Sequence, residues 1–486
     1  MVIETYNYTS ENIPITINIL AKKGEFVNIY EMTIASISKN TELILEKIRK
    51  DLSEEVELGA ADITDQKKGA MIKKRFEDTI KRLIIRYFPS ADEKTLTFLT
   101  SYLIQHSLGL GKIELLLDDV NLEEIAVNGA DQPVWVYHHK HGWLKTNITL
   151  KNEEQVKHYA NLIGRKVGRS ITLLSPLLDA QLDTGERANA TLQPISAIGN
   201  TITIRKFKAK PYTITDFLLE GTATTQAAAL LWMAVQYEMS ILTSGGTASG
   251  KTSLLNALSG FIPPSQRVIS IEDTKELQMP TFMHWIPMLT RLPNVENKGE
   301  VNMLDLLVNS LRMRPDRIIV GEIRRQNEAE VLFEAIHTGH SVYATVHADN
   351  VEETVTRLIN PPINISKTLL PAISLIATMW RNRRTGIRRI LQIAEINKDS
   401  STNVLLQRDI RSDKLNWQGK SKTFLPSLME QTGLNNQEIR KSLQEKESIL
   451  KWMVKKKIDT VDGVGKVMAN YYTNKASLFD YMSKNG

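Results

Sequence analysis

The stretch that most constrains this chain is SILTSGGTASGKTSLLN, which spans residues 240–256. A short apolar strand, Ile241 to Thr243, leads into a loop of small residues that ends in Gly250-Lys251-Thr252, where we expect a helix to begin. This spacing is the phosphate-binding pattern G-x-x-x-x-G-K-T, with Gly245 as its first glycine. Backbone N–H groups in such a turn converge on one point, and the helix N-terminus adds partial positive charge. The stretch therefore predicts a nucleotide-phosphate site.

The residue types of this loop suit the chemistry. Gly245, Gly246 and Gly250 permit positive φ and a close approach of the backbone. Lys251 carries a point charge to the β- and γ-phosphates, and the Thr252 hydroxyl can ligate Mg²⁺ (magnesium). The alternative is a glycine-rich strand-to-helix turn without a ligand. The predicted nucleotide-binding residues are Ser244, Gly245, Gly246, Thr247, Ala248, Ser249, Gly250, Lys251, Thr252 and Ser253.

Carboxylates follow the next predicted strand, in the run Ile271-Glu-Asp-Thr-Lys-Glu276. Unpaired buried charge is costly, so acidic side chains directly after a core strand suggest function. Glu272 or Glu276 could orient the attacking water or hold hydrated Mg²⁺, and the sequence does not separate the two. A solvated acidic turn is the structural alternative.

A third predicted strand ends in another carboxylate, in the run Arg317-Ile-Ile-Val-Gly-Glu322. An acidic group at the tip of an apolar strand beside Mg²⁺ is the Walker B arrangement. Gly321 occupies the position where an aspartate is common, so Glu322 carries the role alone. The predicted metal ligands are therefore Thr252 and Glu322. Arg324 could bind phosphate or pair across a subunit interface.

Two histidines bracket the predicted strand Ser341 to Thr345. His340 precedes it and His347 follows it. A lone histidine is more often structural than catalytic, and a zinc site would need ligands that the sequence does not supply. We interpret the pair as sensing phosphate.

Composition bounds the class of protein. The chain has 486 residues, 42% of them apolar and 24% charged, which is typical of two to four globular domains. Cysteine is absent, so disulfides and cysteine-ligated zinc are excluded. The first residues resemble no signal peptide, and no apolar run reaches the roughly 18 residues that span a membrane. The net charge of +6 permits an anionic partner.

Strands alternate with helices downstream of the phosphate loop, which predicts a mainly parallel sheet with its ligand at the carboxyl ends of the strands. The fold class is therefore α/β. The predicted organisation is a largely helical N-terminal region at 1–108, a smaller α/β domain at 109–207, a linker at 208–222, a nucleotide-binding domain at 223–397 and a helical C-terminal tail at 398–486.

Four motifs in order carry a resemblance to a known family: GGTASGKT, SIEDTKEL, RMRPDRIIVGEIR and TGHSVYATVHAD. They resemble the type II/type IV secretion ATPase superfamily, and within it the archaeal secretion, pilus and archaellum assembly motors. The resemblance covers roughly Gly109 to Ile396. It implies a RecA-like ATPase domain behind a smaller, PAS-like domain. It also implies that the motifs are Walker A, the aspartate box, Walker B with Glu322, and a histidine box.

The same resemblance gives two arginines a role. Family members place arginines of the smaller domain over the nucleotide phosphates, and Arg187 in DTGERANATL and Arg205 in TITIRKF match those segments. A planar guanidinium meets phosphate oxygens bidentately. The family's D-G-x-R pattern is T-G-E-R in this sequence. This departure weakens the assignment of Arg187 more than that of Arg205. The tetracysteine zinc module of many bacterial members has no counterpart.

The resemblance implies a homo-hexameric motor that hydrolyses ATP with Mg²⁺. It would be cytoplasmic, peripheral at the inner face of the cell membrane, and would push a polytopic platform protein. The work would be assembly of a type IV pilus-like or archaellum filament from pilin-like subunits, or protein secretion. In this interpretation, nucleic acid is not expected as a partner. The alternatives are a conjugation-type DNA-transfer motor and a nucleotide-regulated scaffold without hydrolysis.

Overall fold

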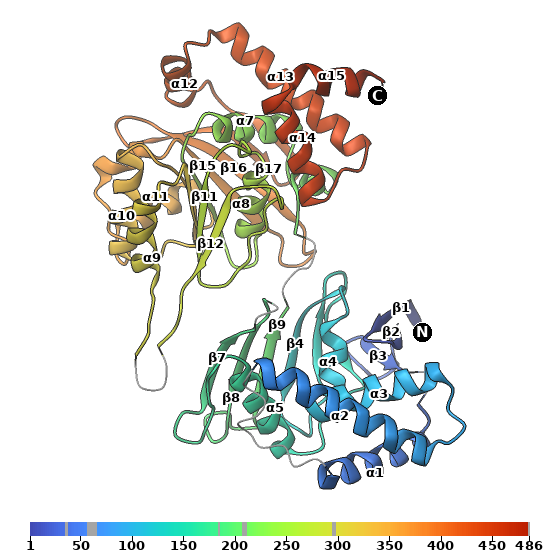
Figure 1. The fold of residues 1–486 in the computed structure, drawn as a ribbon. Coiled ribbons are helices and arrows are strands. Elements are labelled where there is room, and N and C mark those ends of the chain that lie inside the picture. Colours follow the sequence, from blue (N-terminus) through green and yellow to red (C-terminus); the bar gives the residue numbers. More distant parts are fainter. Residues whose placement is uncertain (35–36, 56–65, 183–184, 207–210, 294–297, 485–486) are drawn as a thin grey trace. The chain divides into compact units, whose positions relative to one another are not determined.

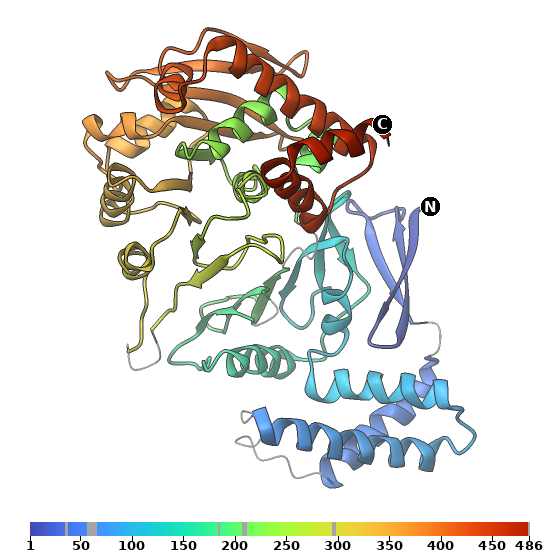
Figure 2. The same ribbon diagram turned by 45° about the horizontal axis from the view of Figure 1, so that its top comes forward.

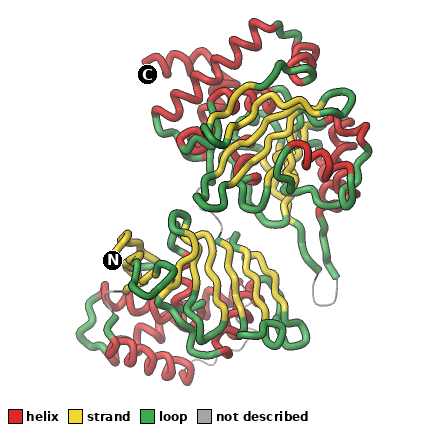
Figure 3. Tube along the Cα trace, turned by 180° about the vertical axis from the view of Figure 1, so that it is seen from behind, coloured by secondary structure: helices red, strands yellow, loops and turns green. Residues whose placement is uncertain are grey.

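The chain divides into two compact units, Met1–Ala209 and Lys210–Gly486, each built on its own sheet. The computed structural model describes residues 1–34, 37–55, 66–182, 185–206, 211–293 and 298–484. Figure 1 labels many of the elements of both units, and Figure 3 shows the two sheets in yellow with their helices in red.

The first unit carries a sheet with the strand order β1-β2-β3-β6-β5-β4-β9-β8-β7. Its strands are β1 (Val2–Ser10), β2 (Ile13–Leu20), β3 (Ile29–Thr33), β4 (Leu122–Asn128), β5 (Trp135–His138), β6 (Gly142–Thr146), β7 (Leu177–Gln181), β8 (Arg187–Thr191) and β9 (Thr201–Arg205). Its helices are α1 (Lys39–Glu55), α2 (Gln66–Tyr87), α3 (Glu93–Leu108), α4 (Lys112–Leu117) and α5 (Glu153–Lys166). A parallel pairing of β3 with β6 joins the N-terminal strands to the rest.

The N-terminal strands are a feature that the prediction missed. Residues 1–108, expected to be largely helical, contain α1 to α3 but also β1 to β3. In β2 every second residue is buried, and Ile13, Ile15, Ile17 and Ile19 point into the core. This period of two is the pattern of a strand with one covered face.

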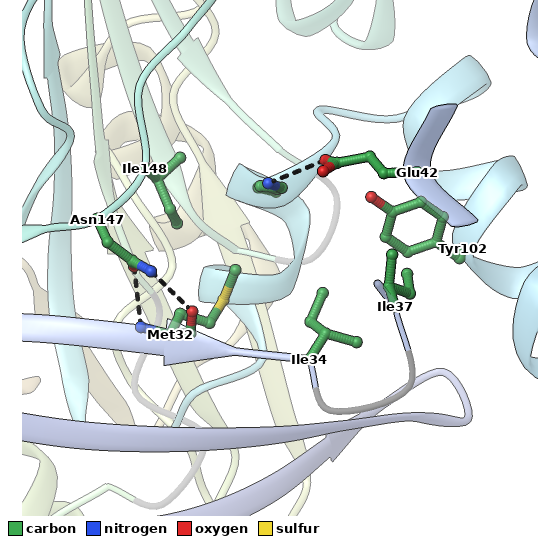
Figure 4. A pocket seen from close by; sticks show the side chains of 8 residues that line it. Met32, Ile34, Ile37, Glu42, Tyr102, Asn147 and Ile148 are labelled. Atoms are coloured by element: carbon green, nitrogen blue, oxygen red, sulfur yellow. Dashed lines mark hydrogen bonds and ion pairs between the residues drawn. The ribbon is translucent and has the colours of Figure 1, made fainter. Parts of the chain in front are cut away.

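A small cavity of about 100 Å³ lies in this unit among β3, α1, α3 and α4 (Figure 4). Asn147 lines it and bridges the backbone of Met32, accepting from its N–H at 2.9 Å and donating to its carbonyl at 2.9 Å. Glu42 and Lys112 form an ion pair of 3.4 Å at its wall. Asn147, Glu42 and Lys112 thus find their polar partners within this unit.

The second unit carries a sheet with the strand order β12-β11-β13-β14-β10-β15-β16-β17-β18. Its strands are β10 (Ile241–Gly245), β11 (Val268–Glu272), β12 (Trp285–Leu289), β13 (Arg317–Val320), β14 (Ser341–Val346), β15 (Leu375–Arg381), β16 (Arg388–Ile396), β17 (Thr402–Asp409) and β18 (Lys414–Trp417). Its helices are α6 (Ile214–Leu219), α7 (Thr225–Gln236), α8 (Lys251–Ser259), α9 (Met303–Ser310), η1 (Leu311–Met313), α10 (Gln326–His337), α11 (Val351–Ile359), η2 (Lys367–Ala372), α12 (Phe424–Thr432), α13 (Asn436–Lys455), α14 (Val461–Thr473) and α15 (Lys475–Lys484).

Helices cover both faces of this second sheet. The core on one face joins the sheet to α9, α10 and α11, and the core on the other joins it to α7, α8 and the C-terminal helices α13 and α14 (Figure 2). Strands β10, β11, β13 and β14 are consequently buried along their whole length, which explains their continuous apolar sequences. In the order of the sheet, the strands β12, β11, β13, β14, β10 and β15 pair in parallel. Their carboxyl ends therefore meet at one edge.

The structure differs from the predicted boundaries at both ends of this unit. The tail at 398–486, expected to be helical, begins with β17 and β18, which extend the sheet by antiparallel pairing. The expected linker at 208–222 contains α6, while residues 208–210 lie outside the described part of the chain.

Over the described residues, no helix is both long enough and apolar enough to cross a membrane.

Candidate functional site: a phosphate loop and strand-end carboxylates

The predicted phosphate loop connects β10 to α8, and its glycines are required by its geometry. Gly245 and Gly250 have φ of 154° and 99°, values that favour glycine. A Cβ at Gly245 would lie 2.5 Å from the Met379 carbonyl oxygen, and one at Gly246 would lie 2.5 Å from Asp349 Oδ1. Since real Cβ atoms do not approach so closely, a side chain at Gly245 would displace the loop from the backbone of β15, whereas one at Gly246 would displace the Asp349 side chain.

The N-terminus of α8 carries no side-chain cap, with Gly250 at the N-cap position. In the same unit Thr224, Asn302 and Asn350 cap α7, α9 and α11 through their side chains. The first N–H groups of a helix have no partner within the helix, so without a cap they remain able to bind an anion. This fits a phosphate group at the loop.

Lys251 folds back over its own loop. Its Nζ donates to the carbonyl oxygens of Gly245 at 2.8 Å and Gly246 at 3.0 Å. Burial lowers the pKa of this half-buried ammonium, and the charges of Glu322, Asp349 and Glu276 oppose that shift. The charges of Glu276, Glu322 and Asp349 thus act on Lys251, and Asp349 was not among the predicted site residues.

Glu272 is the last residue of β11, and its side chain is only 2% exposed. Its Oε1 accepts from the backbone N–H groups of Glu276 at 2.9 Å and Leu277 at 3.1 Å. Its Oε2 is buried without a hydrogen-bond partner among the described residues. Burial raises the pKa of this carboxyl to about 7. A carboxylate of this kind can accept a proton near neutral pH, whereas the side chain of Glu276 is exposed.

Glu322 follows β13 and is held by Arg324. Arg324 Nε lies 2.9 Å and Nη2 2.7 Å from Glu322 Oε2, while Nη1 donates to Asp273 Oδ2. Thr290 Oγ1 donates to the other oxygen of Asp273 at 3.0 Å. Hydroxyl and carboxylate oxygens are the ligands that Mg²⁺ prefers, so the donor set of Thr252 and Glu322 fits this ion.

The structure separates the two histidines. His347 Nε2 lies 3.1 Å from Thr247 Oγ1 of the phosphate loop. His340 precedes β14 at its opposite end, with Nδ1 3.1 Å from the Ala335 carbonyl oxygen. Only His347 is therefore brought to the loop. Among the described residues, no group of three histidine, aspartate or glutamate side chains could hold a metal ion.

Three further residues contact the loop and were not predicted. Asp349 lies against Gly246, Arg388 Nε donates to the Ala248 carbonyl oxygen at 3.0 Å, and Thr354 Oγ1 donates to Ser244 Oγ at 2.8 Å. Asp349 stands two residues after His347, so its place beyond a parallel strand was a usable signal. Arg388 lies on β16, whose contact with the loop is visible only in the fold.

Arg187 and Arg205 lie in the first unit, where they are direct cross-strand partners on β8 and β9. Arg187 forms a bidentate pair with Asp179, with Nε–Oδ1 at 3.2 Å and Nη2–Oδ2 at 2.8 Å. Arg205 is also opposite Glu124 on β4, and its charge opposes the burial that raises the pKa of that carboxyl. Both arginines are exposed, so two guanidinium groups share one face of the sheet.

A largely parallel sheet with helices on both faces, a phosphate loop before an uncapped helix, and carboxylates at the ends of neighbouring strands define a nucleotide-phosphate-binding α/β protein. The family described as "Type II/IV secretion system protein" matches residues 109–408. The chain belongs to this family.

The chain is also similar to individual curated proteins. The chain is 38% identical to "Uncharacterized protein MJ0900" of Methanocaldococcus jannaschii over 315 residues, which are 64% of this chain and 56% of that protein. It is 32% identical to "Putative conjugal transfer protein Rv3659c" of Mycobacterium tuberculosis over 305 residues, 60% of this chain and 85% of that protein. The chain spans about half the length of the first two curated relatives it matches.

Among solved structures, the pilus retraction motor PilT with bound ADP is similar to this chain. The similarity has a TM-score of 0.44 and 18% identity, and covers 73% of this chain and 95% of that one.

Proposed function

We propose that the chain is a motor ATPase, which hydrolyses ATP in a RecA-like second unit that follows a PAS-like domain. As a homo-hexamer it would power assembly of a type IV pilus-like or archaellum filament, or protein secretion. The observation that carries the proposal is the place of Lys251 among carboxylates that follow two neighbouring strands. Glu322 follows β13 and Glu276 follows β11, and both charges oppose the lowering of the Lys251 pKa by burial. Binding alone requires the loop, whereas hydrolysis also requires such acids.

The loop binds the phosphates. The first N–H groups of α8 bind phosphate oxygens, and Lys251 exchanges its two carbonyl partners for the β- and γ-phosphates. This exchange is favourable because a phosphate carries full negative charge and a carbonyl only a dipole. Lys251 then neutralises the charge that develops on the transferring group.

Thr252 and Glu322 would hold Mg²⁺, Glu322 through water. When bound, Mg²⁺ neutralises charge on the phosphate oxygens and fixes their geometry. Arg324 orients Glu322, since it contacts one oxygen of this carboxylate with two of its nitrogens.

Glu272 is the proton acceptor in this proposal. It is buried, its Oε1 is fixed by two N–H donors and its Oε2 has no such partner among the described groups. A pKa of about 7 lets it take a proton from the attacking water near neutral pH. Glu276 is exposed and acts through its charge.

Three further residues have roles in the proposal, His347 in the second unit and two arginines in the first. His347 reports on the phosphates through Thr247, because its imidazole contacts that loop hydroxyl. Arg187 and Arg205 supply guanidinium groups for phosphate oxygens, and their cross-strand pairing supports a shared role.

Membership of the secretion family supports a partner in the membrane. The chain would act at the inner face of the cell membrane, as a peripheral protein on a polytopic platform, with pilin-like subunits as indirect partners.

A second candidate is a DNA-transfer motor, favoured by the relative named as a putative conjugal transfer protein. The sequence pI of about 9.0 is compatible with an acidic polymer as partner. DNA would then stimulate hydrolysis, and the stimulation would fall steeply with salt because phosphate contacts release counterions. Hydrolysis that is indifferent to DNA at low salt would eliminate this candidate.

The test of the proposed function is Glu322→Gln in the full chain. This substitution keeps the shape of the side chain and removes its charge. We expect ATP to bind with an affinity within a few-fold of wild type, while phosphate release falls by about 100-fold or more. Glu330→Gln, on the exposed side of α10, is the matched control and should retain wild-type hydrolysis. Wild-type turnover in Glu322→Gln would contradict the proposal.

A further inference from the structure

The segment that follows β11 ties Glu272 to the rest of the second unit. Its N–H groups at Glu276 and Leu277 bind Glu272 Oε1. The next N–H, of Gln278, donates at 2.8 Å to Oδ1 of Asn256 on α8. The position of the Glu272 carboxyl therefore depends on where this short segment, residues 276–283, is held.

The far end of the segment is held by α14, one of the C-terminal helices. Asp462 Oδ1 accepts from the Thr281 backbone N–H at 2.8 Å and from its hydroxyl at 3.2 Å. One turn further along, Pro280 lies against the backbone of Gly465: a Cβ there would be 2.3 Å from Pro280 Cγ and 2.8 Å from Pro280 Cβ. The proline ring thus occupies the space that any larger residue at position 465 would need.

Gly465 lies inside α14, where glycine costs about 1 kcal/mol relative to alanine. Its conformation is helical and needs no glycine, since its φ is not among the positive values. The close approach of Pro280 is what explains a glycine at this position.

Helix α14 is itself fixed to the elements around the phosphate loop. Tyr472 of α14 donates from its hydroxyl to the Phe261 carbonyl, just after α8, at 2.7 Å, and accepts from Trp232 Nε1 of α7 at 2.8 Å. Val464 and Met468 share a buried core with Leu277 of the segment. A shift of α14 would therefore be transmitted to residues 276–283.

We propose that Asp462 and Gly465 are positioning residues for Glu272, so that the C-terminal helices control hydrolysis through residues 276–283. Neither residue touches the carboxyl group; both act through the segment that supplies its N–H donors. The inference rests on the proposed role of Glu272 as proton acceptor.

Loss of a purely structural contact and loss of a contact that positions Glu272 should change the pH dependence of kcat differently. The N–H groups of Glu276 and Leu277 lower the pKa of Glu272, against the burial that raises it. Among the neighbouring charges, that of Glu276 raises the pKa of this carboxyl and that of Lys275 lowers it. If the segment moves away, the N–H donors are lost, the pKa rises, and less of the base is ionised at neutral pH.

The experiment measures kcat and KM for ATP against pH in the full chain, for wild type, Gly465→Ala, Asp462→Ala, Asp462→Asn and Lys466→Ala. Gly465→Ala adds one methyl group against Pro280, and Asp462→Ala removes the acceptor of Thr281. Asp462→Asn keeps an acceptor oxygen. Lys466→Ala changes an exposed neighbour of Gly465 on the same helix. Thermal unfolding of each variant identifies any that fails to fold.

We expect kcat at pH 7 to fall about 10-fold in Gly465→Ala and Asp462→Ala, with KM for ATP changed less than about 3-fold. In the plot of kcat against pH, the midpoint of the rise on the acid side, the acid limb, should shift upward by about 0.5 to 1 pH unit. The loss of kcat relative to wild type should therefore be smaller at pH 9 than at pH 7. Asp462→Asn should recover most of kcat, and Lys466→Ala should match wild type.

The inference is overturned if folded Gly465→Ala and Asp462→Ala keep the wild-type kcat and acid limb. It is also overturned if they lose kcat equally at every pH. Glu272→Gln, measured alongside, separates the two levels: its inactivity together with unaffected α14 variants rejects the positioning role alone. Wild-type turnover in Glu272→Gln rejects the proposed role of Glu272 itself.

Discussion

Arg324 Nε lies 2.9 Å from Glu322 Oε2, and the same guanidinium donates through Nη1 to Asp273. Glu322 follows β13 and Asp273 follows β11, and these two strands are paired neighbours. The Arg324 guanidinium therefore links the carboxylates that follow two adjacent strands. They lie at the edge of the sheet where β10 ends and the phosphate loop begins. The sequence suggested that Arg324 could bind phosphate or pair across a subunit interface; in the structure its guanidinium contacts two carboxylates.

Arg324→Ala tests this orientation. Without the guanidinium, Glu322 and Asp273 repel each other and lose a fixed geometry, so we expect kcat for ATP to fall about 10-fold or more. The free energy of unfolding should change by less than about 1 kcal/mol, because the pairs are partly exposed and screened by solvent. Arg312→Ala, at another exposed arginine, is the control. An unchanged kcat in Arg324→Ala would contradict the role of Arg324 in orienting Glu322.

The pH dependence of hydrolysis should follow Glu272. A proton acceptor works only when ionised, and burial places the pKa of this carboxyl at about 7. We therefore expect kcat to rise with pH through about 7. A kcat that is flat between pH 6 and 8, with chemistry rate-limiting, would contradict Glu272 as the base.

The raised pKa of Glu272 also predicts how the stability of Glu272→Gln compares with that of wild type as the pH changes. The raised pKa means that the folded chain binds more protons than the unfolded chain between pH 4.5 and about 7. The contribution of this group is therefore fully present below pH 4.5 and is lost as the pH rises through about 7. Chemical denaturation should find the variant gaining stability over wild type across this window, by an amount on the order of 3 kcal/mol. A constant difference would contradict burial of the carboxylate.

The two histidines should differ in effect. His347 contacts Thr247 of the loop and His340 lies beyond the other end of β14. We expect His347→Ala to lower kcat/KM for ATP about 10-fold and His340→Ala to have a clearly smaller effect. Steady-state kinetics on the two variants, prepared in parallel, check this. An equal or larger loss in His340→Ala would contradict the placement.

Arg317 should matter for stability and not for catalysis. It is fully buried at the amino end of β13, away from Glu322, and donates to Gln266, Ser341 and Tyr343 side chains. Arg317→Met removes the donor to Gln266 and Ser341 and leaves Tyr343 with Ser341 as its donor, which should lower the free energy of unfolding by about 3 kcal/mol. Arg440→Ala, exposed on α13, should be neutral. Denaturation with kcat measured on the folded fraction distinguishes the two roles, and a normal stability would contradict the prediction.

The local sequence was informative where one stretch determines its own geometry. The phosphate loop lies where G-x-x-x-x-G-K-T predicts, between a buried strand and α8. Glu272 ends one buried strand and Glu322 follows another, as the apolar runs before them indicate. These features depend on backbone conformation and on apolar periodicity, both of which can be read within a few residues.

Contacts between distant segments could not be read in this way. Arg388 reaches Ala248, and Asp462 reaches Thr281, across 140 and 181 positions of sequence. Strand β12 is mixed and half exposed at the edge of its sheet, so its pattern is weak. The helical prediction for 398–486 missed β17 and β18 because helix signals further along, in α13, dominated the interpretation.

The central claim is that Lys251 belongs to a site that turns over ATP. The most direct measurement is steady-state phosphate release by the full chain with ATP and Mg²⁺, comparing wild type with Lys251→Ala. Removing this ammonium deletes the charge that neutralises the transferring phosphoryl group. The account predicts hydrolysis by wild type and a loss of about 100-fold or more in the variant. Wild-type turnover in Lys251→Ala would contradict it.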